Sequence, residues 1–230
     1  MNQSEVLSAS KIHLRERIIL ASRDSFAKHG IKNTRMDDIA AALKISKRTL
    51  YEIFPDKETL LLESVRYFRD KGIQGQKEVL RSSEDIMNNI LQFYTLIMSG
   101  YRDTNKAFFE DIMKYPKVHQ MVLERQAEED RLAVQIMERG VEQGVFRGDI
   151  NFALMQDLAR KQLYFFIWSE VLQQDTFLEK YKTLMLIYLR GISTEEGARR
   201  LEHFLRIRQT NAGSETIDNE NQKVYKKLTE

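Results

Sequence analysis

Cysteine is absent from this chain of 230 residues, and long uncharged apolar runs are absent as well. Without cysteine the chain forms neither disulfides nor thiolate metal sites, which argues against an oxidised, secreted scaffold. The apolar runs end well short of the length that spans a membrane. The first ten residues are polar and lack the apolar core of a signal peptide. We therefore expect a soluble protein of the cytoplasm.

Sequence motifs of catalysis are missing too. No P-loop, GxGxxG or GxSxG stretch follows a strand-like pattern, because no strand-like pattern occurs. The histidines lie far apart, and none has the spacing of a metal-binding motif such as HExxH: His13, His29, His119 and His203. We therefore expect no catalytic residue, no metal and no cofactor, and an enzyme is the least favoured class of function.

The composition is that of an ordinary globular protein with a slightly basic start. Hydrophobic residues make up 42% of the chain and charged residues 30%, which suffices for a buried core. The net charge is only +2, but residues 1–60 hold eleven Lys and Arg against eight Asp and Glu. This small local excess is in keeping with nucleic-acid binding whose non-specific affinity is modest and salt-sensitive.

The stretch from Thr34 to Leu62 contains three short helical patterns with almost no spacer between them. Thr34 and Asp37 resemble a capping box, which predicts that the first helix starts near Arg35. Its apolar residues recur at the spacing of one helical face: Met36, Ile39, Ala40 and Leu43. This helix is expected to end by Lys44.

The second pattern begins after Ser46, whose side chain predicts a helix N-cap. Leu50 and Phe54 fall on its apolar side, and hydrogen-bond donors occupy another face: Lys47, Arg48, Thr49 and Tyr51. Two helices joined by so short a turn cross steeply, as in a helix-turn-helix whose second helix enters the major groove of DNA. The alternative that these helices alone leave open is an ordinary solvated surface.

The third pattern starts beyond Pro55, with Asp56 as its expected cap and Lys57 in its first turn. A lysine at this position opposes the helix dipole. A nearby phosphate would satisfy both Lys57 and the unpaired N–H groups of this helix end. The three patterns together predict a head that reads DNA.

Residues Ile18–Leu62 resemble the N-terminal domain of the TetR family of bacterial transcriptional regulators. A first helix ending in Phe26, Lys28 and Gly30 is followed, in the family's order, by TRMDDIA, ISKRTLY and FPDKETLL. The resemblance implies an all-α protein with a three-helix DNA-binding domain and a larger helical domain for ligand binding and dimerisation. It also implies phosphate contacts from Thr34, Tyr51 and Lys57, and groove contacts from Lys47, Arg48 and Thr49.

The chain departs from this family at two positions. Lys44 stands where the family usually has a glycine in the turn, so it either adopts a left-handed conformation at some cost or changes the turn. Arg48 replaces another frequent glycine and adds a long bidentate donor that suits guanine. The second departure means that no known operator sequence carries over to this chain.

The third helical pattern continues to Lys71, where Gly72 and Gly75 follow. Either the helix ends there and a loop follows, or the glycines form a hinge that lets the helix swing. We assign residues 1–58 to the DNA-binding domain and residues 59–210 to the helical domain. The polar residues 211–230 are expected to be a disordered tail.

Two late helices, at about 150–173 and 176–192, carry apolar residues on two sides. A helix that is apolar on two sides needs two partners. The core of the same subunit provides one partner, and a second subunit is the simplest source of the other. The resemblance likewise implies a four-helix dimer interface, and a two-fold dimer predicts a palindromic operator.

The helical domain is rich in aromatic residues and methionine, which are mostly expected to form its core. The resemblance implies that a subset lines a pocket for a small hydrophobic or amphipathic ligand. The candidates are Phe93, Tyr94, Met98, Phe108, Phe109, Met113, Tyr164, Phe165 and Trp168.

Three hypotheses of function follow. The leading one is a dimeric repressor of transcription that a small ligand releases from DNA. The second is a DNA-binding regulator that a protein partner controls. The third is a helical ligand-binding or protein-interaction module that does not read DNA.

Overall fold

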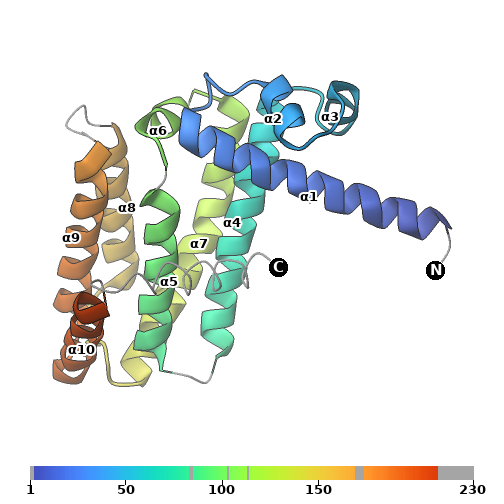
Figure 1. Ribbon diagram of the computed structural model, residues 1–230. Helices are drawn as coiled ribbons and strands as arrows, with labels where there is room; N and C mark the ends of the chain where they lie inside the picture. Colours follow the sequence, from blue (N-terminus) through green and yellow to red (C-terminus); the bar gives the residue numbers. More distant parts are fainter. Residues whose placement is uncertain (1–2, 83–84, 103, 113, 169–173, 212–230) are drawn as a thin grey trace. The chain divides into compact units, whose positions relative to one another are not determined.

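A computed structural model describes residues 3–82, 85–102, 104–112, 114–168 and 174–211. These residues form α-helices joined by short loops, with a single isolated bridge between Phe146 and Ser193 in place of any sheet (Figure 1). The predicted all-α fold is therefore confirmed. The helices are α1 (Gln3–His29), α2 (Met36–Ala42), α3 (Lys47–Ile53), α4 (Lys57–Arg81), α5 (Ile86–Arg102), α6 (Lys106–Ile112), α7 (Pro116–Glu142), α8 (Phe152–Trp168), α9 (Gln174–Ile192) and α10 (Glu195–Asn211).

The chain divides into two compact units that differ from the expected division at residue 58. Unit 1 comprises Met1–Asp70 together with Asp103–Arg125, and unit 2 comprises Lys71–Arg102 together with Gln126–Glu230. Unit 1 therefore contains α1, α2 and α3, and it adds α6 from the middle of the chain. Helices α4 and α7 each contribute residues to both units.

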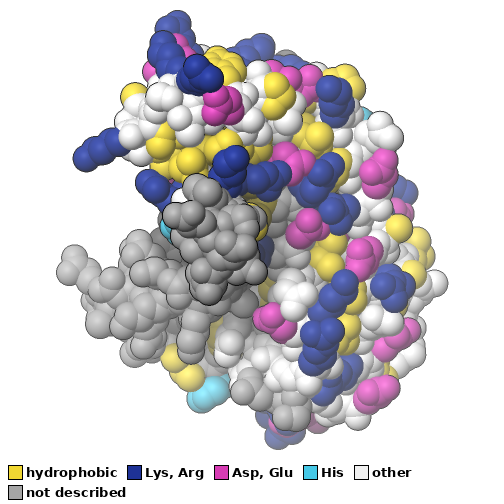
Figure 2. Space-filling model, turned by 90° about the vertical axis from the view of Figure 1, so that its right-hand side faces the viewer, with side chains coloured by type: hydrophobic (Ala, Val, Ile, Leu, Met, Phe, Trp, Pro, Cys, Tyr) yellow, Lys and Arg dark blue, Asp and Glu magenta, His cyan; other side chains and the backbone are white. Residues whose placement is uncertain are grey.

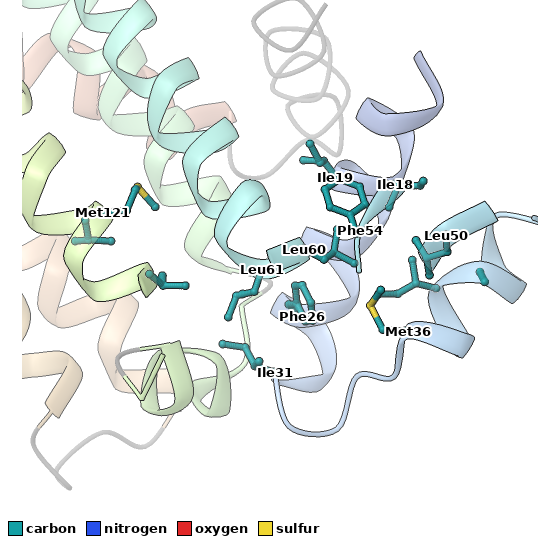
Figure 3. Packing of buried hydrophobic residues seen from close by; sticks show 14 residues of the cluster. Ile18, Ile19, Phe26, Ile31, Met36, Leu50, Phe54, Leu60, Leu61 and Met121 are labelled. Carbon is teal, nitrogen blue, oxygen red and sulfur yellow. The ribbon is translucent and has the colours of Figure 1, made fainter. Parts of the chain in front are cut away.

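The core of unit 1 joins the helix-turn-helix to residues far along the chain. Phe26, Leu50 and Phe54 are buried completely or almost so, and they belong to one hydrophobic cluster. The same cluster includes residues from α7, of which Met121 appears in the close view: Val118, Met121 and Val122 (Figure 3). Burial of a large apolar side chain stabilises a fold by about 1.5–3 kcal/mol, so the α7 residues are part of what holds the head together.

The polar sequence of residues 1–11 predicts a frayed segment, followed by a helix from about His13. Helix α1 instead begins at Gln3, so this prediction is wrong for the described part of the segment. The segment from Gln3 to Lys11 lacks both glycine and proline, so extending the helix through it carries little penalty in intrinsic propensity.

Helix α4 runs unbroken through Gly72 and Gly75, so the expected loop is absent at this point. A Cβ atom placed on Gly75 would lie 3.5 Å from the Phe93 ring, an ordinary packing distance. Phe93 of α5 therefore lies next to this turn of α4. Whether they also form a hinge stays a prediction.

Unit 2 is a helical body in which the starts of α8 and α10 differ from expectation. The sequence predicts Asp149 as the cap of α8, and Ser193 in a capping box with Glu196 as the cap of α10. Asn151 caps α8 by accepting a hydrogen bond from the Leu154 N–H at 3.0 Å, whereas Asp149 pairs with Arg147. Thr194, not Ser193, caps α10 and accepts from the Gly197 N–H at 3.1 Å. Residues 212–230, the predicted tail, lie outside the described residues.

Helices α8 and α9 pack against each other. The predicted second apolar side of α8 is exposed at Leu154, Leu158 and Phe165. On α9 the exposed large apolar residue among those described is Ile187, whereas Leu189 and Ile192 of its predicted second side are buried. The three residues on α8 are spaced by four and seven positions, which places them on one side of the helix. No described helix is both long enough and apolar enough to span a membrane.

Candidate nucleic-acid interface

The turn between α2 and α3 is closed by a left-handed lysine. Lys44 has a φ of 57°, so the first of the two expected outcomes at this position is confirmed. Its N–H bonds to the Ala41 carbonyl, and the Ile45 N–H bonds to the Ala40 carbonyl, both at 3.0 Å. This pair of bonds is a Schellman motif, which normally places glycine at the left-handed residue.

Helix α3 starts as the sequence predicts. Ser46 is its N-cap, and the Ser46 hydroxyl oxygen accepts from the Thr49 N–H at 3.0 Å. One helical face is fixed in the core by Leu50, and the chain leaves the helix through the buried Phe54. The opposite face therefore has a defined orientation toward solvent.

That outer face carries Lys47, Arg48 and Tyr51, three of the six residues predicted to contact DNA. The side chains of Lys47 and Arg48 are 67% and 89% exposed, and Tyr51 is 45% exposed. Thr49 is half-buried beside the cap, where its hydroxyl lies 2.8 Å from that of Ser46. Long donors on a helix held by Leu50 are the arrangement that reads base edges in a major groove.

Each cation of α3 has a carboxylate partner in the protein without DNA. The Lys47 Nζ donates to Asp37 of α2 at 2.5 Å, and the Arg48 Nε donates to Glu52 one turn further along α3 at 2.8 Å. The hydrogen bond and the charge of Asp37 raise the pKa of Lys47. Lys47 is therefore fully charged at neutral pH, and its exposed ion pair can be exchanged for a phosphate at small cost.

Thr34 has a structural role that the sequence did not predict. Thr34 is only 2% exposed, and its hydroxyl bonds to the carbonyls of Gly30 at 2.9 Å and Ser25 at 3.2 Å. The predicted capping box is wrong, because the N-cap of α2 is Arg35 and makes no side-chain cap bond. The Thr34 side chain faces the protein and is not available to a phosphate in this conformation.

Lys57 is likewise engaged by the protein. Its Nζ donates to the carbonyls of Ile31 at 3.0 Å and Thr34 at 3.2 Å, with a weaker bond to Lys32. These carbonyls compensate for a cation in the first turn of α4, the position for which we had expected a phosphate. The predicted cap is confirmed, since Asp56 accepts from the Thr59 N–H at 2.7 Å and this bond lowers the pKa of Asp56.

A buried carboxylate that the sequence did not indicate ties α6 to the loop after α1. Asp111 is 5% exposed, accepts from the Lys32 N–H at 3.3 Å and pairs with the Lys114 ammonium at 3.0 Å. Burial raises the pKa of Asp111, but the hydrogen bonds from Lys114 and Lys32 outweigh it and hold this pKa below its ordinary value. Sequence reasoning missed this residue because its partner lies 79 positions away.

The predicted ligand-binding residues do not come together in one described cavity. Phe108 packs against the core cluster of unit 1, with Phe109 edge-on beside it at 5.6 Å. Phe165 is 67% exposed, while Phe93 and Tyr164 are half-buried in unit 2. Met113 and the side chains of Tyr94, Met98 and Trp168 lie outside what the structure describes.

A cleft of about 490 Å³ in unit 2 lies between α10 and the start of α5, and none of the predicted residues lines it. Its walls combine charged and apolar side chains: Asp85, Asn88, Arg199, Arg200, His203, Phe204 and Ile207. Arg200 bonds to Asp85 at 2.7 Å, so much of the cleft's charge is paired within the protein.

The surface in Figure 2 shows Lys and Arg interspersed with Asp and Glu, with no single basic patch over this face. The fold and the outer face of α3 define a helix-turn-helix DNA-binding protein.

Comparison with known proteins points to a similar family for the N-terminal part of the chain. Residues 18–64 match the family described as bacterial regulatory proteins, tetR family. Over these residues, which contain α2 and α3, the chain is similar to this family of transcriptional regulators.

Longer parts of the chain are similar to one relative in sequence and to solved structures in fold. The transcriptional repressor KstR2 of Rhodococcus jostii is 25% identical over 170 residues, which cover 70% of this chain and 83% of that protein. A TetR regulatory protein from Mycobacterium vanbaalenii has the same fold, with a TM-score of 0.61 and 17% identity over 82% of this chain and 99% of its own. A regulator from Saccharomonospora viridis, solved in complex with choline, has a TM-score of 0.54 and 19% identity over 80% of this chain and 99% of its own.

Proposed function

We propose that this protein is a dimeric repressor of transcription that binds a palindromic operator and is released by a small hydrophobic or amphipathic ligand. The observation that carries the proposal is α3, which rests on the buried Leu50 and presents Lys47, Arg48 and Tyr51 outward. The name of the KstR2 relative, a repressor, supports the negative sign of regulation. The protein acts in the cytoplasm, where its operator DNA lies.

The DNA contacts divide into two kinds. Arg48 and Thr49 meet base edges, while Tyr51 and Lys47 meet phosphates or bases at the groove wall once Asp37 releases Lys47. Lys57 and Thr34 support the interface from behind, because they fix the loop before α2 through backbone carbonyls. The backbone N–H groups at the start of α4 remain suited to a phosphate.

The dimer forms through the exposed apolar face of α8 and α9. Four large apolar side chains on these two packed helices are about half exposed or more, whereas soluble monomers rarely leave such patches uncovered. A second copy of the chain is the partner whose matching face buries them about a two-fold axis. That symmetry is what makes the operator palindromic.

The effector binds in unit 2. Gln76 Oε1 and Asn89 Nδ2 are buried there without a hydrogen-bond partner among the described residues, and they supply one acceptor and one donor. A buried polar atom without a partner costs about 1–3 kcal/mol, which a ligand with matching groups would recover. The structure with choline shows that a protein of this fold holds a small molecule. Ligand binding then favours a dimer whose heads no longer fit two successive grooves.

A gel-shift experiment with DNA from upstream of the protein's own coding region tests the DNA-binding part. The wild type is expected to shift this DNA, and an Arg48→Ala, Tyr51→Ala double variant is expected to bind at least 100-fold more weakly. The control variant Glu124→Gln changes one charge on exposed α7 surface and should bind like the wild type. Equal binding by the double variant would overturn the assignment of α3.

Two further measurements test the dimer and the effector. Light scattering at micromolar concentration should give twice the 27.1 kDa chain mass, and a Leu158→Glu variant should give the mass of one chain. A screened ligand that releases DNA should also raise the melting temperature, because it binds the native state. A wild-type chain that stays monomeric would contradict the dimer, and hydrophobic ligands without either effect would contradict the effector.

A further inference from the structure

The ion pair on the outer face of α3 places a carboxylate where DNA is expected to bind. Glu52 is 60% exposed, one helical turn after Arg48, and both side chains lie on the face away from Leu50. Such an exposed pair at i and i+4 stabilises a helix by only about 0.3–0.5 kcal/mol. A negative charge on this face also repels phosphates. Helix stability is therefore a weak reason for placing a glutamate there.

The geometry of the pair leaves both groups able to read bases. Glu52 accepts from the Arg48 Nε at 2.8 Å, so the two terminal nitrogens of the guanidinium remain as a fork. A fork of this kind matches O6 and N7 of guanine, which is the commonest specific contact of arginine in the major groove. The second carboxylate oxygen of Glu52 remains an acceptor.

We propose that Arg48 and Glu52 together read a G·C base pair in each half of the operator. Arg48 contacts guanine, and Glu52 accepts from the exocyclic amino group of cytosine. Glu52 also positions the guanidinium through Nε. This inference rests on the proposed DNA-binding function.

The carboxylate of Glu52 makes the Arg48–Glu52 pair selective among base pairs, whereas Arg48 alone would mainly add attraction to DNA. Guanine N7 and O6 and thymine O4 are acceptors, so each of them leaves Glu52 facing another acceptor. Only an amino donor, cytosine N4 or adenine N6, compensates for bringing this charge into the groove, and the contact of Arg48 with the paired guanine selects cytosine. Glu52 thus weakens binding to most sequences and costs least at the matching pair, which raises specificity by penalising wrong sites.

The test uses the full chain and a pool of random duplexes. Selection with the wild type should return palindromic sites with a fixed G·C pair in each half. Replacing that pair with A·T in one half-site should weaken wild-type binding roughly 5- to 150-fold, as measured by fluorescence anisotropy. Arg48→Lys keeps the charge but loses the fork, and should lose most of this discrimination.

Glu52→Gln should bind random duplexes several-fold more tightly than the wild type and select a broader set of sites. Glu124→Gln carries the same change of charge on exposed α7 surface and should leave the selected sites unchanged. The proposal is overturned if wild-type sites contain no fixed G·C pair, or if Arg48→Lys and Glu52→Gln keep the wild-type penalty. A wild type that binds no duplex at all would instead show that the DNA-binding function itself is wrong.

Discussion

The two units of this protein differ in the hydrogen bonding of their buried polar groups. In unit 1 the buried polar residues among those described each have a hydrogen-bond partner: Ser22, Thr34, Ser64 and Asp111. In unit 2, Gln76 and Asn89 each have a buried amide atom without one, and four large apolar side chains of α8 and α9 are exposed. Unit 2 therefore carries buried amide atoms and a group of exposed apolar side chains that a ligand or a second subunit would satisfy.

This difference matches the tasks proposed for the two units. A surface that reads DNA must hold α3 in one orientation, and the hydrogen-bonded buried residues of unit 1 serve this purpose. A unit that binds an effector and a second subunit contains polar atoms and apolar side chains that gain their partners only on binding. The contrast predicts that equivalent substitutions have different consequences in the two units.

The largest effect is expected from a pair of phenylalanines. Phe26→Ala removes a fully buried ring of unit 1 and should lower the free energy of unfolding by about 3–5 kcal/mol. Phe165→Ala, on a ring that is 67% exposed, should change it by less than about 0.5 kcal/mol in a monomeric background but weaken self-association. Urea unfolding and light scattering, both in the Leu158→Glu background and without it, separate these effects. Equal losses of stability would remove the contrast.

The next effect concerns Asp111 and pH. The folded protein holds the pKa of Asp111 below its ordinary value of about 4, so the ionised form contributes stability above that pH and loses it as the pH falls through the folded pKa. Asp111→Asn should cost about 1–3 kcal/mol at pH 7, and the difference from wild type should shrink below about pH 4. Thermal melts between pH 3 and pH 7 measure this.

The exposed Asp149 provides the control for that prediction. The hydrogen bond from Arg147 lowers the pKa of Asp149, but this pair lies in solvent. Asp149→Asn should therefore change the melting temperature much less than Asp111→Asn at pH 7. A difference at Asp111 that is independent of pH would show that its charge is not what stabilises unit 1.

A smaller, stabilising effect is expected at Lys44. Its left-handed backbone costs roughly 1–2 kcal/mol, while glycine adopts it freely but loses about 0.5–1 kcal/mol of chain entropy. Lys44→Gly should therefore raise stability by about 0.5–1 kcal/mol, as measured by urea unfolding. Lys44→Ala removes the same charge and keeps the strain, so it should bring no such gain. Equal gains from both variants would assign the effect to the charge.

The smallest effect separates helix propensity from hinge motion in α4. A Cβ atom on Gly72 would meet nothing within 4 Å, so Gly72→Ala should stabilise the helix by up to about 1 kcal/mol. If Gly72 is a hinge, the variant should bind operator normally but need more effector for release. Gly191→Ala, at an equally open site near the end of α9, should leave release unchanged. Normal release by Gly72→Ala would argue against the hinge.

Local features of the head could be predicted from sequence because they depend on neighbours within a few residues. The cap at Ser46, the cap at Asp56 and the strained turn at Lys44 all follow this rule. Thr34 and Lys57 resisted prediction because their partners come from the packing of α1 and its loop. For both residues, hydrogen bonds to backbone carbonyls outweigh the local preference for capping or for the helix dipole. Only the tertiary fold brings these carbonyls within reach.

Features that join distant segments could not be predicted. Asp111 and Met121 belong to unit 1 although about fifty or more residues separate them from the helix-turn-helix. Helical periodicity shows which face of α7 is apolar, but it does not tell which of two cores that face enters. For the same reason Phe108 was assigned to a ligand pocket, whereas it packs against the core of the head.

Because unit 1 is built from two segments of the chain, its core forms late during synthesis and is incomplete in short N-terminal fragments. Synthesis proceeds from the N-terminus, so the helix-turn-helix leaves the ribosome well before Val118, Met121 and Val122 exist to pack against it. A fragment ending at residue 58 or 70 would keep the DNA-reading side chains but expose the apolar surface that these three residues cover. Until the chain has grown past Arg125, the nascent unit 1 lacks the residues that complete its core.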